Sequence, residues 1–142
     1  MKEKHSRHDA ARSEYHMYGH TLLRVVIGLL FIITGWAKLQ NPAGIIGMVG
    51  SVPLFGSAAT LFGWVVIISE LLFGALILVG YKVRYTAWPL AFILLVATLS
   101  FVGPNPEQGW LSVNAFFHYI SIAVLVSLAW TGPGEWAISE VR

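Results

Sequence analysis

The chain has 142 residues, of which 56% are hydrophobic and only 11% are charged, and its formal net charge is +2. A soluble domain carries about 25% charged residues, so this composition indicates a membrane protein built as one domain. The small net charge argues against a nucleic-acid partner. The absence of cysteine excludes disulfides, thiolate metal sites and iron–sulfur clusters made from the chain's own side chains.

Residues 1–20 are hydrophilic and are predicted to form a polar cytoplasmic tail. The tail carries four histidines whose spacing of three or four residues would present pairs to a metal ion if the tail were helical; these are His5, His8, His16 and His20. Because a short polar segment has little apolar surface to bury, we expect solvated disorder instead. The sequence therefore predicts no metal site.

Four apolar segments follow, at about 21–39, 60–80, 85–103 and 112–131. Each has roughly the twenty residues that a helix needs to cross the hydrocarbon core of a bilayer. Residues 103–109 and 131–134 are rich in glycine and proline, which end helices. The sequence thus predicts an all-α, four-transmembrane-helix bundle over residues 21–134, with a short cytoplasmic tail at 135–142.

The connector at 40–59 is apolar and uncharged, but glycine and proline interrupt it too often for a spanning helix. One interpretation is a segment lying in the outer membrane interface. The other is a lid or re-entrant piece over a cavity between the helices. We favour the interfacial interpretation, because the connector has nothing polar with which to line a site.

The basic residues set the orientation, since short loops rich in lysine and arginine stay in the cytoplasm. With both termini inside, eight of the nine basic residues lie on the cytoplasmic side: Lys2, Lys4, Arg7, Arg12, Arg24, Lys82, Arg84 and Arg142. Only Lys38 is then outside. We predict a multi-pass protein of the cell (plasma) membrane with both termini in the cytoplasm.

Glu70 lies in the middle of the second span, which is otherwise uncharged. A carboxyl at that depth is costly unless it is paired or protonated, and it commonly marks a functional site. Side chains on a helix tilt toward its N-terminus, so Lys38 leans into the membrane from the outer end of the first helix. Glu70 and His118 lean outward, because their helices run inward. We expect all three side chains to converge in the outer half of the bundle.

Small residues share the faces of the first two helices, at spacings of three and four that suit close helix packing. We predict helix contacts at Gly28, Gly35, Gly63 and Gly74. Arg24 lies on the same face of the first helix near its cytoplasmic end, where it forms a separate inner site or snorkels to the surface. The third helix offers only Thr98 and Ser100, and we interpret it as mostly structural.

Glu70 has two interpretations that the residues leave open. It locks helix packing as a paired or protonated carboxyl, or it accepts protons or binds a ligand. His118 has a comparable structural interpretation as a histidine bonded to a neighbouring helix. Haem ligation by His118 is disfavoured, because bis-histidine haem needs a second histidine at matching depth, and His20 lies at the opposite boundary.

Several positions in order resemble the DoxX family of four-helix membrane proteins, from Arg24 to Glu140. They are Arg24, Gly28, Phe31, Gly35 and Lys38, then Glu70, Gly74 and Gly80, then Arg84, and finally Gly132, Gly134 and Glu140. The resemblance implies redox work near the quinone pool, since some members are membrane subunits of thiosulfate:quinone oxidoreductase or accompany terminal quinol oxidases. Others associate with thiol and oxidative-stress systems. It also implies that Arg24, Lys38 and Glu70 are the family-like polar positions.

We therefore expect a small membrane subunit of a quinone-linked redox complex, with a polar site formed by Lys38, Glu70 and His118. Quinone is then the expected ligand, and other subunits of such a complex, or further copies of this chain, are the expected partners within the bilayer. No catalytic residue is assigned, because the chain has no evident cofactor motif. The alternative is a non-catalytic scaffold or assembly factor in which Glu70 is a packing group; a small-solute transporter is a third hypothesis.

Overall fold

The structure of the protein, a computed structural model, describes residues 2–106 and 109–138, with side chains from residue 18 onward. Within these ranges the fold is all-α, as predicted, and no strand is present. The helices are α1 (Lys2–Gln40), α2 (Pro42–Gly50), α3 (Ala59–Val79), α4 (Val83–Ala97) and α5 (Val113–Thr131). A 3-10 turn, η1 (Gly56–Ala58), precedes α3, and a π-helical turn, η2 (Thr98–Val102), extends α4.

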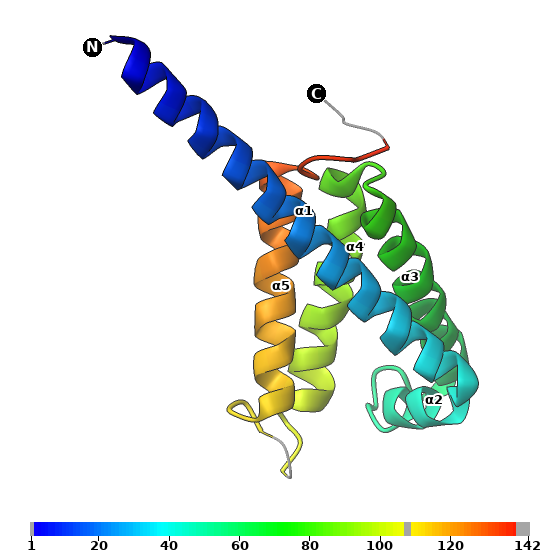
Figure 1. Cartoon of the computed structure of the whole chain (residues 1–142). Coiled ribbons are helices and arrows are strands. Elements are labelled where there is room, and N and C mark those ends of the chain that lie inside the picture. Colours follow the sequence, from blue (N-terminus) through cyan, green and yellow to red (C-terminus); the bar gives the residue numbers. More distant parts are fainter. Residues whose placement is uncertain (1, 107–108, 139–142) are drawn as a thin grey trace.

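Four helical stretches of the described chain are long and apolar enough to cross a membrane, which confirms the predicted spans. They are Tyr18–Gln40, Gly56–Val79, Val83–Val102 and Val113–Thr131. Because the number of spans is even, both ends of the membrane domain lie on the same side. Figure 1 shows the beginning of α1 and the segment that follows α5 at that shared end of the molecule. We call it the inner end, in keeping with the predicted topology, and the opposite end the outer end.

The expectation of a disordered N-terminal tail is wrong for the backbone, because α1 begins at Lys2 and runs without interruption into the first span. Residues 2–17 contain neither proline nor glycine and are rich in good helix formers. The span supplies the first turns, so the tail needs only to propagate the helix and not to nucleate it. The side chains of His5, His8 and His16 lie outside the described residues.

The spans are arranged as two pairs, with α1 packed mainly on α3 and α4 mainly on α5 (Figure 1). The turn after α3 joins the pairs at the inner end, where Gly80 adopts a left-handed conformation with φ 78° that closes α3. The buried core lies in the inner half of the spans, and it includes Ile27, Ile77, Leu90, Leu125 and Leu128.

The predicted glycine contacts are present. A Cβ atom added to Gly28 would lie 2.9 Å from the backbone of Leu78, and one added to Gly74 would lie 2.9 Å from the Phe31 side chain. Gly35 packs in the same way against Leu71 and Glu70, and Gly63 packs against Ile46 of α2. The glycines therefore let α1 approach α3 closely, and they let α2 lie on the outer end of α3.

The segment that follows α5 turns back across the inner ends of α1 and α3. The hydroxyl of Thr21 donates to the carbonyl of Glu135 at 3.1 Å, and the Ile138 amide donates to the carbonyl of Val79 at 3.2 Å. The rings of Tyr18 and Trp136 meet edge to face. Residues 135–138 are thus folded against the bundle, and 139–142 lie outside the described residues.

Candidate functional site

A cavity of about 1290 Å³ lies between the two helix pairs, in the outer half of the bundle. All four spans contribute to its wall, and so does the connector that contains α2. The lining side chains that matter for its chemistry are Thr34 and Lys38 of α1, Glu70 of α3, Ser100 of η2, and Asn114, His118 and Ser121 of α5. Its mostly apolar wall with a few polar groups is typical of a small-molecule site.

Lys38 and Glu70 form an ion pair in this wall, as their predicted convergence requires. The ammonium nitrogen of Lys38 lies 2.6 Å from Oε1 and 2.5 Å from Oε2 of Glu70. The Glu70 side chain is 4% exposed, and that of Lys38 is 30% exposed. The hydroxyl of Thr34 is a further neighbour of the carboxylate, 3.5 Å from Oε2. The carboxylate is therefore buried and paired, while the Lys38 side chain remains partly exposed.

His118 is hydrogen-bonded to Thr98, with 2.9 Å between Nδ1 and Oγ1. The Thr98 hydroxyl has a single proton, and it donates that proton to the carbonyl of Leu94 at 2.6 Å. The histidine must then donate from Nδ1, which leaves Nε2 of the neutral ring as an acceptor. No described residue hydrogen-bonds to Nε2, so this atom is available to a ligand in the cavity.

The third span contributes more to the site than its sequence suggested, and the expectation that it is mostly structural is wrong. Thr98 orients His118, and Ser100 lines the cavity. Both belong to the π-helical turn η2, in which the amide of Gly103 donates to the carbonyl of Thr98 at 2.9 Å. Such wide turns are frequent at functional sites. A sequence pattern based on the α-helical period cannot detect this turn, but a cluster of polar residues at the end of an apolar span is a usable signal.

The connector also lines the cavity, contrary to the expectation that it has nothing polar with which to line a site. Ile45, Met48, Val49, Ser51 and Phe55 all line the cavity, and α2 packs on α3. The expectation failed on two counts: four of these five side chains are apolar and line the cavity without polar groups, and the fifth, Ser51, is polar.

Arg24 lies apart from this cavity, near the inner end of α1, and it does not snorkel. It is 3% exposed, and its Nη2 atom donates to the carbonyl of Trp136 at 3.4 Å. Its Nε and Nη1 atoms are buried, and none of the described residues forms a hydrogen bond with them. The structure thus separates Arg24 from Lys38, Glu70 and His118.

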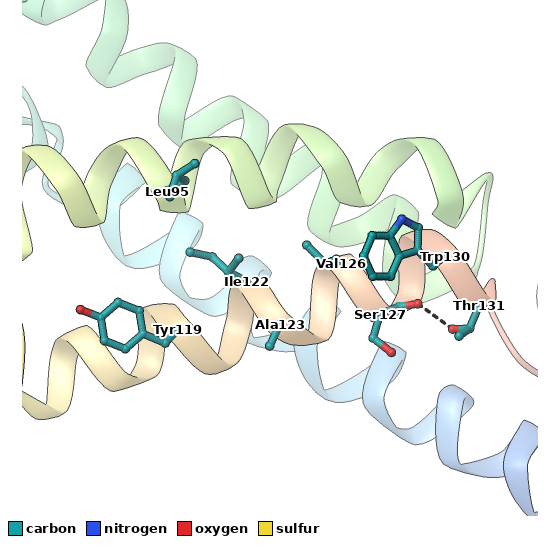
Figure 2. Close-up of a pocket in the computed structure, with 8 residues that line it drawn as sticks. All are labelled: Leu95, Tyr119, Ile122, Ala123, Val126, Ser127, Trp130 and Thr131. Atoms are coloured by element: carbon teal, nitrogen blue, oxygen red, sulfur yellow. Dashed lines mark hydrogen bonds between the residues drawn. The ribbon is translucent and has the colours of Figure 1, made fainter.

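A second hollow of about 630 Å³ lies on the outside of α4 and α5. Figure 2 shows its lining, with the rings of Tyr119 and Trp130 at its two ends. The Thr131 hydroxyl donates to the carbonyl of Ser127 at 2.7 Å, so it is already engaged within its own helix. This open groove has no charged side chain in its wall, and it offers lipid chains an apolar surface without the polar groups that chemistry needs.

No group of three or more histidine, aspartate, glutamate or cysteine residues is placed to hold a metal ion in the part of the chain that the structure describes. His20 is bonded to Thr131 at 3.3 Å, at the inner end. It is therefore separated from His118 by most of the length of α5.

The fold and the site together define a small four-helix membrane protein with a buried ion pair in the wall of an internal cavity. The family model for DoxX matches residues 19–103, and the chain belongs to the DoxX family. One relative, named "Putative oxidoreductase CatD", from Bacillus subtilis, is 31% identical over 116 residues, which cover 80% of this chain and 79% of the relative. Another, "Uncharacterized membrane protein Rv3486" from Mycobacterium tuberculosis, is 29% identical over 131 residues, covering 83% and 77%. No solved structure matches the chain.

Proposed function

We propose that the protein is a plasma-membrane subunit of a redox complex and that its cavity binds a lipid-soluble quinone. The observation that carries this proposal is the position of the Lys38–Glu70 pair and His118 in the wall of one large cavity between the helix pairs. The name of the Bacillus subtilis relative, "Putative oxidoreductase CatD", supports the same chemical class.

The polar groups of the cavity suit both redox forms of the ligand, the quinone and the quinol. The ammonium of Lys38 donates hydrogen bonds, as a quinone carbonyl requires. The free Nε2 of His118 accepts one, as a quinol hydroxyl requires. A head group held between these side chains would have both a proton donor and a proton acceptor within reach.

The cavity also has a place for an apolar tail. Its deeper wall contains Leu30, Phe31, Phe92, Ile93 and Leu94, none of which is polar. Polar groups in one part of the wall and an apolar stretch in another fit a ligand with a polar head and an isoprenoid tail. The volume, about 1290 Å³, exceeds the roughly 300–1,000 Å³ of typical drug-sized sites, and so leaves room for part of that tail.

Reduction of a quinone to a quinol requires two electrons and two protons. The protons would pass through Lys38, Glu70 or His118. The electrons would come from a redox cofactor, such as a flavin or an iron–sulfur cluster, held by a partner subunit, because this chain has no cysteine to hold a cluster of its own.

Titration of the purified protein with a short-chain quinone, followed by quenching of tryptophan fluorescence, tests the proposal. Thr98→Val removes the hydroxyl that fixes the His118 ring and should weaken binding by about tenfold, the equivalent of one lost hydrogen bond. Ser127→Ala is the matched control, because Ser127 lines the groove on the far side of α5 from the cavity. This variant should bind quinone as the native protein does. Absence of binding by the native protein would refute the proposal.

A scaffold role is the second candidate, because the Lys38–Glu70 pair bridges α1 and α3 and Gly35 packs against Glu70. In that case Glu70→Gln should lower thermal stability or the recovery of a partner while leaving turnover per assembled complex intact. A Glu70→Gln variant that is equally stable, recovers its partner and loses turnover would exclude the scaffold role.

A further inference from the structure

We infer that the cavity exchanges protons and polar solutes with only one side of the membrane, the side opposite to the chain termini. The inference rests on the proposed function in one respect: one-sided proton exchange is relevant only if the cavity binds a quinone. The evidence for it is the distribution of polar and apolar side chains along the bundle. In the predicted topology this side is the outer one.

The outer end of the cavity is polar and open. Lys38 is 30% exposed, and the connector residue Ser51 in the cavity wall is exposed. The loop residues Pro104, Asn105 and Pro106 form the rim beyond η2. Water at this rim would find hydroxyl, amide and ammonium groups, which ordered water needs for its hydrogen bonds.

The inner half of the bundle is closed by tightly packed apolar side chains. Ile77, Leu90, Leu125 and Leu128 are 0% exposed, and Phe31 is 1% exposed. They belong to one continuous cluster that includes residues of all four spans. Close packing of this kind leaves no room for a chain of water molecules.

This layer is thick enough to stop proton transfer. Leu128 lies seven positions after Ser121, a deep polar residue of the cavity, along α5, which corresponds to about 10 Å of helix. Val79 lies nine positions after Glu70 along α3, or about 13 Å.

Among the described residues, the buried polar residues of this inner half are Thr21, Arg24 and Thr86. The hydroxyl of Thr21 and the guanidinium of Arg24 donate to carbonyls of the segment after α5, and the Thr86 hydroxyl is directed to the carbonyls of Tyr81 and Lys82. Arginine stays protonated, so Arg24 does not relay protons. Protons bound or released at Lys38, Glu70 or His118 therefore have a path to one face alone.

The lack of native cysteine makes a direct test available, because every thiol in a single-cysteine variant is the introduced one. Ser100→Cys and Ser121→Cys place thiols in the cavity with little change in size. Ala87→Cys places one in the closed inner layer, where the native side chain is 0% exposed. Ser51→Cys and Lys82→Cys report the two faces, since both positions are exposed and lie in connectors at opposite ends of the spans.

The full chain is reconstituted in vesicles, and a membrane-impermeant thiol reagent is added to one face at a time. We expect Ser100→Cys and Ser121→Cys to react from the face that labels Ser51→Cys and to stay unreacted from the face that labels Lys82→Cys. Ala87→Cys should react from neither. Labelling of either cavity thiol from the Lys82 face, or of neither cavity thiol from any face, would overturn the inference.

Failure of this inference and failure of the proposed function can be told apart. Thiol labelling requires no quinone, so one-sided access can be established in a protein that binds none. Conversely, quinone binding with cavity thiols that react from both faces would support the quinone site and refute one-sided proton exchange.

Discussion

The two partners of the Lys38–Glu70 pair should contribute unequally to stability, because their surroundings differ. Lys38→Met leaves a carboxyl with 4% exposure whose remaining neighbour is the Thr34 hydroxyl at 3.5 Å. Loss of one partner of a buried pair costs about 3–5 kcal/mol, and we expect about 3 kcal/mol because Glu70 can take up a proton. Glu70→Gln leaves a lysine that is 30% exposed, so the loss should be about 1 kcal/mol, as for an exposed pair.

The double variant tests whether the pair is coupled. Combining Lys38→Met with Glu70→Gln removes both charges. Neither an unpaired carboxylate nor an unpaired ammonium group is then left in the site. We expect a total loss of about 2 kcal/mol where independent effects would sum to about 4, which is a coupling of about 2 kcal/mol.

The measurement is the free energy of unfolding in mixed detergent and dodecyl sulfate micelles, followed by far-ultraviolet circular dichroism. Thr34→Val serves as a neighbouring control, since it removes the weakest contact of Glu70 without changing either charge. The reasoning is refuted if Glu70→Gln destabilises the protein as much as Lys38→Met, or if the two single effects simply add.

Three further predictions use the same unfolding assay. Gly28→Ala should destabilise the protein by about 1–3 kcal/mol, since its Cβ would lie 2.9 Å from the Leu78 backbone. Gly47→Ala is the control: an added Cβ there would have nothing within 4 Å, so this change should be neutral or stabilising. Equal losses in both variants would contradict the steric explanation. Ser112→Ala should cost about 1 kcal/mol, because the Ser112 hydroxyl accepts from an amide of the first turn of α5 at 3.1 Å; an unchanged stability would mean that this cap contributes nothing. Arg24→Met should leave stability unchanged or raised, because it removes two buried nitrogens to which the described residues offer no hydrogen-bond partner. A loss above about 2 kcal/mol would refute this reasoning and would mean that the contact of Nη2 with the Trp136 carbonyl outweighs the cost of burying the guanidinium.

Much of the fold could be predicted from the sequence because membrane spans are set by the length and composition of apolar runs, which are properties of single segments. The Lys38–Glu70 contact could be predicted because the direction of helical side chains follows from the direction of each helix. The glycine contacts follow from the same reasoning, since small residues at spacings of three and four mark close helix approach.

The remaining features of the cavity depend on how the helices pack against one another, which single segments of sequence do not determine. The contribution of Met48 to the cavity depends on where α2 packs against α3, which an apolar connector does not reveal. The position of Thr98 beside His118 depends on the π-helical turn, which has no periodic signature in five residues. The helix at residues 2–17 could have been recognised from the absence of breakers, but its polarity suggested disorder.

The wide turn η2 also gives the site a distinctive vulnerability to insertion and deletion. A π-helical turn contains one residue more than the α-helix around it, so deletion of one residue within Thr98–Val102 would restore an ordinary α-helix. The span would keep nearly its full length and would still cross the membrane, and the residues beyond the deletion would keep nearly the same orientation, because the wide turn accommodates its extra residue locally. The side chains inside the turn, Thr98 and Ser100 among them, would change position. Gain or loss of a single codon in this segment could therefore reshape the cavity rim while the four-helix fold persists.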